Sequence, residues 1–263
     1  MFLLAYLGLG AFAGVLAGLL GVGGGIVIVP VLTFLFTSQG LPAPYIAHLA
    51  LGTSLATIIF TSISSLRAHH ARGAVDWQVV RRISAGIVAG TLAGSWVAAQ
   101  LSTTALKVFF VIFIYYVATQ MLLNIRPKPS RQIPGTGVMF GVGGIIGWVS
   151  SLVGIGGGSL SVPFMVWCNM SMHNSIGTSA AIGFPIALAG AAGYAVNGLA
   201  AGALPPWSLG FVYLPALAGV SLASVVTAPI GARLAHSLPV AKLKKSFALL
   251  LIVMGTKLLT TLL

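Results

Sequence analysis

Long apolar segments recur from one end of this chain to the other, with short loops between them. They lie near residues 2–20, 26–36, 45–66, 79–99, 103–124, 137–153, 158–168, 173–196, 208–230 and 241–262. Only 5% of the 263 residues are charged, whereas a soluble domain carries about 25%. Such a chain cannot cover a water-exposed surface. The sequence therefore predicts an all-α polytopic membrane protein with eight to ten membrane segments.

The charges are almost all positive, with a formal net charge of +12 and Asp76 as the only acidic residue. The basic residues do not form the single patch that nucleic-acid binding would need. They lie in loops: Arg67, Arg72, Arg81, Arg82, Arg126, Lys128, Arg131, Arg233, Lys242, Lys244 and Lys245. Cytoplasmic loops have this composition. We therefore expect a multi-pass protein of the cell (inner) membrane, in contact with the lipid bilayer and not with nucleic acid.

Two stretches of the chain carry the same pattern. "GLLGVGGGIVIVPVL" begins at Gly18 and "SLVGIGGGSLSVPFM" at Ser151, so that Gly21 matches Gly154 and Pro30 matches Pro163 at a constant offset of 133. "HLALGTS" and "HNSIGTS" follow in the same order at an offset of 125, and "RGAVDW" is answered by "AGALPPW". The sequence predicts two tandem repeats, 1–124 and 137–263, joined by a cytoplasmic linker at 125–136.

Positive charge also indicates the orientation of the two repeats. Residues 137–168 would span about 48 Å as a helix, too long for one crossing of about 30 Å and short for two. Two crossings with the glycines at the bend keep the basic loop 233–245 inside, and the same count places the N-terminus outside. Each half then has five segments, and the second is inverted. Whether 26–36 and 158–168 are full spans or re-entrant half-helices stays open.

The glycine triplets indicate where the helices break and what could bind there. A helix that begins inside the membrane has unpaired N–H groups at a positive dipole end, and glycine lets an anion approach them. The alternative is close helix packing, for which "AGIVAGTLAG" from Ala85 is typical. The candidate substrate-binding residues at the two breaks are Gly23, Gly24, Gly25, Gly156, Gly157, Gly158 and Ser159.

The paired H-x-x-x-G-T-S motifs add polar candidates to this site. They contribute His48, Thr53, Ser54, His173, Thr178 and Ser179. Histidine can bind an anion or carry a proton near neutral pH, and ionisable groups within a membrane are functional candidates. The alternative is a neutral histidine bonded to a backbone carbonyl, with the hydroxyls bonded to their own helix. His69, His70 and His236 lie beside basic loops, where we expect contact with solvent.

Several function classes lack their signatures. No lysine follows a glycine loop as in an ATPase, and the glycine stretches lack the dinucleotide-binding spacing. No Cys/His cluster has metal-ligand spacing. We expect neither an enzyme nor a cofactor or metal. A cation carrier would want a membrane carboxylate, so the absence of one favours a small anionic substrate.

The two glycine stretches and the G-T-S motifs at Gly52 and Gly177 resemble the TauE/SafE family of sulfite exporter-like membrane proteins. The resemblance covers nearly the whole chain and implies a transporter of small sulfur-containing anions, such as sulfite or organosulfonates. Asn174 and Ser175 depart from Leu49 and Ala50 of the first half, which indicates an asymmetric site. An anion channel, a carrier of another small anion and a non-transporting membrane scaffold remain alternatives. Homo-oligomer formation and proton coupling stay open.

Overall fold

A computed structural model describes residues 2–21, 23–123, 130–202, 204–237 and 240–260; the side chains of 236, 237, 240–244 and 246 are not described. In these ranges the chain is almost entirely helical. The elements are α1 (Phe2–Leu20), α2 (Gly25–Ser38), η1 (Ala43–Tyr45), α3 (Ile46–His70), α4 (Trp77–Gln100), α5 (Thr103–Leu122), α6 (Thr136–Val153), α7 (Gly158–Trp167), α8 (Met172–Gly198), β1 (Ser208–Leu209), β2 (Val212–Tyr213), α9 (Leu214–Ser237) and α10 (Val240–Thr260). Seven helices of the described part are long and apolar enough to span a membrane. The predicted all-α polytopic fold is confirmed.

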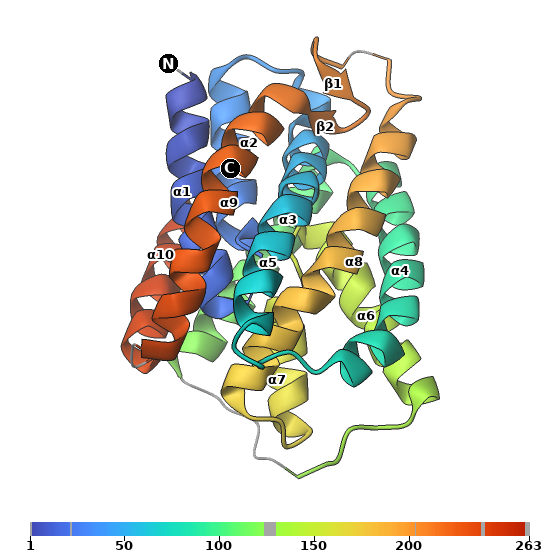
Figure 1. Cartoon of the computed structure of the whole chain (residues 1–263). Coiled ribbons are helices and arrows are strands. Elements are labelled where there is room, and N and C mark those ends of the chain that lie inside the picture. Colours follow the sequence, from blue (N-terminus) through green and yellow to red (C-terminus); the bar gives the residue numbers. More distant parts are fainter. Residues whose placement is uncertain (1, 22, 124–129, 203, 238–239, 261–263) are drawn as a thin grey trace.

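The helices pack around a central pair. Figure 1 shows α3 and α8 crossing the middle of the bundle, with α1 and α9 on one side and α4 and α6 on the other. Helix α1 packs along α9, and α6 packs along α4. Helix α9 also contacts α3, whereas α4 contacts α8, and α5 packs against α10. Each outer pair therefore joins a helix from the first half of the chain to one from the second.

Glycines let these outer pairs approach closely. A Cβ atom added at Gly86 or Gly90 of α4 would overlap the carbonyl oxygens of Phe140 and Gly144 of α6. A Cβ atom added at Gly10 of α1 would likewise overlap the carbonyl oxygen of Val220 of α9. Small residues at such contacts increase van der Waals packing between membrane helices. The packing role expected for the "AGIVAGTLAG" glycines is confirmed.

The two short helices, α2 and α7, each run back along the bundle toward the starting end of the preceding helix, α1 or α6. The amide of Gln39, at the end of α2, donates to the hydroxyl of Tyr6 in the second turn of α1. The indole of Trp167, the last residue of α7, donates to Ser130 Oγ at 2.9 Å, ahead of α6. Figure 1 accordingly shows α2 beside the upper part of α1, and α7 at the lower end of the bundle. Helices α1 and α2 therefore form one helical hairpin, and α6 and α7 form another. The G-x-G-G-G segments lie at the two hairpin tips.

Residues 208–213 do not belong to the segment expected at 208–230. They form the antiparallel pair β1–β2, with Gly210 at a φ of +53° in the turn. Helix α9 begins only at Leu214, so Trp207 precedes it by seven residues, whereas Trp77 is the first residue of α4. The matched stretches "RGAVDW" and "AGALPPW" therefore do not occupy equivalent positions relative to the helices that follow them. Residues 125–129 of the linker expected at 125–136 lie outside the described residues.

Candidate functional site

The glycine triplets interrupt the helices as the sequence predicts. Gly24 has a φ of +77° and Gly157 a φ of +76°, and they are the residues that precede α2 and α7. Gly21 and Gly154 also have positive φ, at +67° and +71°. An L-residue with a side chain rarely adopts this left-handed region, so glycine is required where the chain reverses.

The two hairpin tips meet inside the protein. A Cβ atom added at Gly25 would overlap the carbonyl oxygen of Gly154, and one added at Gly23 would lie 3.3 Å from the Cα of Gly156. Gly24, Gly25 and the whole of 156–158 are buried, and Gly23 is half-buried. The two G-x-G-G-G segments therefore lie against each other in the centre of the bundle.

A serine from each half holds the tip of the other. Ser54 Oγ in α3 donates to the carbonyl oxygen of Gly154 at 2.7 Å. Ser179 Oγ in α8 donates to the carbonyl oxygen of Gly21 at 2.9 Å and lies 2.8 Å from Ser161 Oγ of α7. All of these side chains are buried. The G-T-S serines thus join the glycine segments, as the site hypothesis required, but their hydroxyls already have protein partners.

The threonines of the same motifs hold a different part of the chain. Thr53 Oγ1 accepts from the backbone N–H of Tyr213, just before α9, at 2.9 Å. Thr178 Oγ1 accepts from the N–H of Asp76, just before α4, also at 2.9 Å. The glycines preceding them, Gly52 and Gly177, leave room for the carbonyls of Phe211 and Ala74. Each G-T-S motif therefore binds the start of an outer helix and, one residue later, a hairpin tip.

The two motif histidines lie in unlike surroundings. His48 is buried, and its Nε2 lies 3.1 Å from both the Ala98 and the Leu101 carbonyl oxygens at the end of α4. Its ring centroid lies 4.9 Å from that of Phe211. His173 is exposed in the first turn of α8. Each precedes its motif serine by six residues, about 9 Å along a helix. The structure therefore does not bring the histidines to the glycine tips.

Two of the three histidines expected in solvent have described side chains, and one of these two is exposed. His70 is exposed and accepts from the indole of Trp77 at 3.3 Å. His69 is buried, with Nε2 2.9 Å from the carbonyl oxygen of Gly18, so the expectation for it is wrong. It fills a position in α3 that contacts the end of α1. The side chain of His236 lies outside the described residues.

A small cavity of about 10 Å³ lies beside the first hairpin tip. Its walls are small residues of α1, α3, α8 and the tip itself: Ala17, Gly21, Gly23, Ser62, Ser65, Ala180 and Gly183. Ser65 Oγ is buried with no hydrogen-bond partner in the described structure, while Ser62 Oγ donates to Ile59 O at 3.0 Å. A space of this size holds a single water.

Two further hydroxyls near the second tip, Ser150 Oγ and Ser159 Oγ, are likewise buried and unbonded among the described atoms. Sequence reasoning selected Ser159 but missed Ser62, Ser65 and Ser150. The signal for Ser62 and Ser65 was a recurrence of hydroxyl residues along an otherwise apolar helix, in "TSLATIIFTSISS" from Thr53. Among the described residues, no group of three His, Cys, Asp or Glu side chains could hold a metal ion.

Comparison with known proteins agrees with this architecture. The profile of the family described as Sulfite exporter TauE/SafE matches residues 6–258. The chain belongs to the TauE/SafE family. A relative in Haemophilus influenzae, named a probable membrane transporter protein, is 38% identical over 97% of each chain. YunE and YdhB of Bacillus subtilis carry the same description and are 33% and 26% identical.

These relatives differ in how much of the chain they match. YdhB covers 94% of this chain and 96% of its own length. YunE covers 60% of this chain and 65% of its own length. No solved structure matches the chain significantly. The family and membrane transport as the general function rest on the family profile and the Haemophilus influenzae relative, which match nearly the whole chain. The multi-pass membrane fold rests on the seven long apolar helices of the described part.

Proposed function

We propose that the protein is a secondary transporter of the cell (inner) membrane. Its substrates would be small sulfur-containing anions, such as sulfite or organosulfonates, and it would work by alternating access. The family description supports sulfite or a related anion, and the names of the relatives support transport. The observation that carries the proposal is the meeting of the two buried hairpin tips.

An anion suits this meeting point for an electrostatic reason. Helices α2 and α7 both begin there, and the first turn of a helix presents unpaired N–H groups at a positive dipole end. Asp76 is the only acidic residue of the chain, and its carboxylate accepts from Gln78 N and Val79 N at the start of α4. No carboxylate is therefore left to repel an anion at the tips or to bind a cation.

The proposed substrate site consists of the two glycine segments and the buried hydroxyls near them. Gly23 lies against Gly156 and Gly25 against Gly154, with Gly24, Gly157 and Gly158 beside them in the same two segments. The buried hydroxyls of Ser65 and Ser159, which have no partner among the described atoms, would provide donors, and Ser62 lines the cavity beside Ser65. Ser54 and Ser179 hold the tips in register, and Thr53 and Thr178 hold the outer helices. A direct role of His48 or His173 stays a prediction.

We further propose that the halves 1–124 and 137–263 are inverted repeats that move against each other. Reciprocal contacts support this: Ser54 binds Gly154 while Ser179 binds Gly21, and Thr53 binds Tyr213 while Thr178 binds Asp76. Inverted-repeat transporters bind substrate at broken helices between the repeats. A one-water cavity cannot hold sulfite, so the helices must separate for binding. This favours a carrier over an open channel.

A flux screen tests the proposal. The full-length protein would be reconstituted in vesicles and offered labelled sulfite, an organosulfonate, thiosulfate, a neutral sugar and sodium, with and without a pH gradient. We expect saturable flux of a sulfur anion alone, and the pH arm reports proton coupling. Flux of the cation or sugar would refute the anion site. Vesicles that accumulate none of the anions would favour a non-transporting scaffold.

A further inference from the structure

A groove of about 680 Å³ lies between α3 and α9 on the outside of the bundle, and no hairpin-tip residue lines it. One end of it is apolar. Phe60 and Ile63 of α3 face Val225 and Pro229 of α9, and Ser64 Oγ donates to Val225 O at 2.7 Å across the floor. Phe60 is 46% exposed and Val225 38% exposed. In a membrane, this end of the groove opens to lipid.

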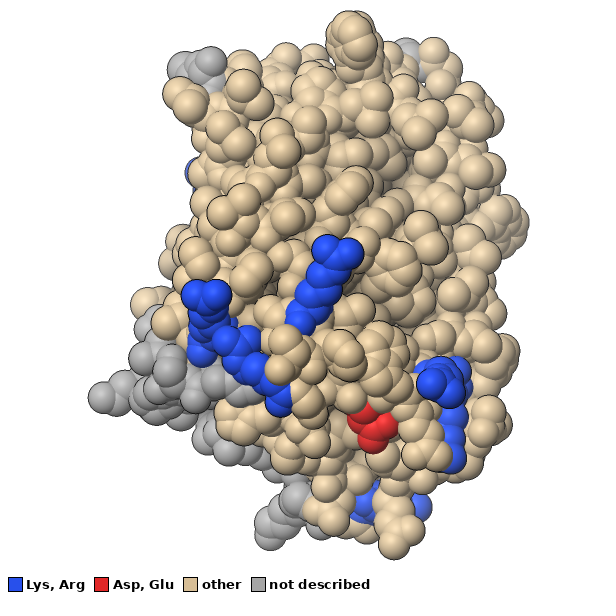
Figure 2. All heavy atoms as spheres, in the orientation of Figure 1, with Lys and Arg blue, Asp and Glu red and all other residues tan. Residues whose placement is uncertain are grey.

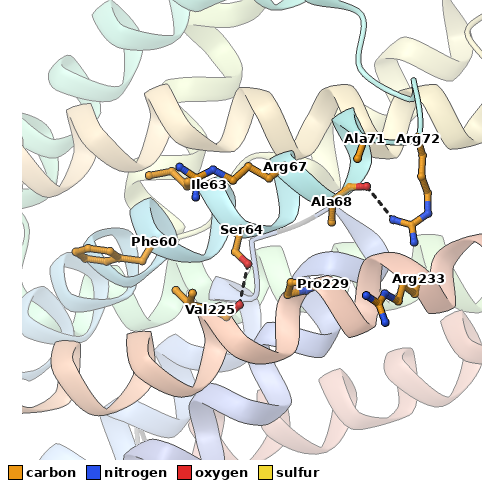
Figure 3. A pocket seen from close by; sticks show the side chains of 10 residues that line it. All are labelled: Phe60, Ile63, Ser64, Arg67, Ala68, Ala71, Arg72, Val225, Pro229 and Arg233. Carbon is orange, nitrogen blue, oxygen red and sulfur yellow. Dashed lines mark hydrogen bonds between the residues drawn. The ribbon is translucent and has the colours of Figure 1, made fainter.

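The rest of the groove is lined by three arginines. Figure 3 shows Arg72 and Arg233 at the end opposite Phe60, with Arg67 between and its side chain extended along the groove toward Ile63. Arg72 Nη1 donates to Ala68 O at 2.8 Å. Arg67 has no hydrogen bond within the described structure and is exposed. An arginine has five N–H donors, so the cluster retains capacity for an anionic ligand.

Among the residues that the structure describes, no acidic side chain pairs with Arg67 or Arg72. Asp76, the only acid in the chain, caps α4 through its own carboxylate. A guanidinium along the outer face of a membrane helix is costly unless an anion or water reaches it. The groove therefore favours an anionic group beside its arginines and a hydrocarbon group along its apolar end.

The arginines are not required by helix packing. Matching α3 to α8 and α4 to α9 through the reciprocal contacts pairs Arg67 with Ala192, Arg72 with Asn197 and Arg233 with Trp96. The equivalent surface of the α8–α4 pair thus lacks all three charges. The matched positions of the α3–α9 and α8–α4 pairs differ in charge because they lie toward opposite faces of the membrane. Arg67 and Arg72 lie at the basic end of the bundle, which the positive-inside rule assigns to the cytoplasm.

Figure 2 shows this end directly: on the face drawn, the Lys and Arg side chains gather over the lower half, and the upper half is nearly free of them. Trp77, 39% exposed, stands at the same end as the first residue of α4, and tryptophan is enriched at membrane interfaces. The cytoplasmic leaflet carries anionic lipids that basic pockets between membrane helices recognise.

We propose that this groove binds an anionic phospholipid of the cytoplasmic leaflet. The lipid phosphate lies at the end of the groove that carries Arg72 and Arg233, the exposed Arg67 side chain turns toward it, and an acyl chain lies along Phe60 and Val225. A free inorganic anion fits less well, because the space greatly exceeds its size and half of the lining offers it no hydrogen bond. The apolar half specifies a ligand with a hydrocarbon tail.

Native mass spectrometry of the full-length protein with phosphatidylglycerol or phosphatidylcholine tests the proposal. We expect retained phosphatidylglycerol and little phosphatidylcholine. The double variant R67Q/R233Q should bind phosphatidylglycerol about 30-fold more weakly. R81Q/R82Q, with the same loss of charge outside the groove, should bind like the wild type. Thermal unfolding of each variant without lipid shows whether the fold persists.

Two further measurements identify which part of the ligand binds. F60N should also weaken retention, because it removes apolar surface and leaves all three arginines. Glycerophosphoglycerol, the headgroup without acyl chains, should not displace the lipid. Equal retention by R67Q/R233Q and wild type, equal binding of the two lipids, or displacement by glycerophosphoglycerol, phosphate or sulfite would overturn the proposal.

Discussion

Ser54 donates to the carbonyl oxygen of Gly154 at 2.7 Å, and this one bond joins the central helix of the first half to the broken hairpin of the second. Its counterpart from Ser179 to Gly21 joins the halves in the opposite sense. Both bonds are buried, and both end on glycines with positive φ. The position of each hairpin tip therefore depends on the other half of the chain.

Replacing Ser54 with alanine should destabilise the protein moderately. Hydrogen bonds between membrane helices contribute about 0.6 kcal/mol on average and about 1.7 kcal/mol at most. Thermal unfolding in a fixed detergent should shift down for S54A and S179A. The control is S38A, whose exposed hydroxyl bonds only to Leu35 of its own helix. An S54A protein as stable as S38A would mean that the tips do not depend on this bond.

Gly183→Ala should reduce transport while the fold persists. A Cβ atom at Gly183 would lie 3.4 Å from Gly156 O and 3.7 Å from Ser62 Cβ, which are ordinary contacts, yet it points into the small cavity. The control is G144A on α6, where the nearest atom would be 3.8 Å away. Flux and unfolding should be measured together. Normal flux in G183A would remove the Ser62–Ser65 cavity from the substrate site.

Gly25→Ala should prevent assembly of the native fold. Its Cβ would overlap Gly154 O and crowd the Cα of Ile155, and these backbone atoms cannot move without displacing the second hairpin tip. Gly8 of α1, where an added Cβ would have no atom within 4 Å, should accept alanine at no cost. The yield of monodisperse protein after purification distinguishes the two. A well-folded G25A would mean that the tips are further apart than described.

The sequence was most informative where a local pattern determines a backbone conformation. Three consecutive glycines mark a reversal because no other residue adopts positive φ readily, and their repetition identified both hairpins. The partners of the G-T-S hydroxyls could not be predicted in this way. Thr53 meets Tyr213 and Thr178 meets Asp76 only after folding. The offset between matched residues also changes, from 133 at the glycines to 125 at the G-T-S motifs and 137 for Asp76 and Tyr213.

The histidines illustrate the same limit. His48 and His173 match in sequence, but the burial of each depends on what packs over it. Phe211 and the end of α4 cover His48, whereas His173 lies at the exposed start of α8. Equivalent positions in a repeat therefore need not have equivalent roles.

Replacing His48 and His173 with alanine, one at a time, should show which histidine stabilises the fold and whether either one is needed for transport. H48A leaves the Ala98 and Leu101 carbonyls without their shared partner and opens space beside Phe211, so we expect a lower unfolding temperature. H173A should unfold like the wild type. Flux assays on both variants complete the test. If H173A kept its stability and lost transport, a substrate or proton role for His173 would stand despite its distance from the tips.

The side of the membrane reached by each hairpin end can be measured with single cysteines in a C168S background. We expect Leu4→Cys and Ser38→Cys, at the two ends of the α1–α2 hairpin, to react with a membrane-impermeant maleimide from outside. Ser130→Cys and Asn169→Cys, flanking α6–α7, should react only from the cytoplasm. All four positions are exposed, so access to the reagent depends on the side of the membrane. Labelling of Ser130→Cys and Asn169→Cys from opposite sides would mean that α6 and α7 cross the membrane together. The second half would then not be an inverted copy of the first.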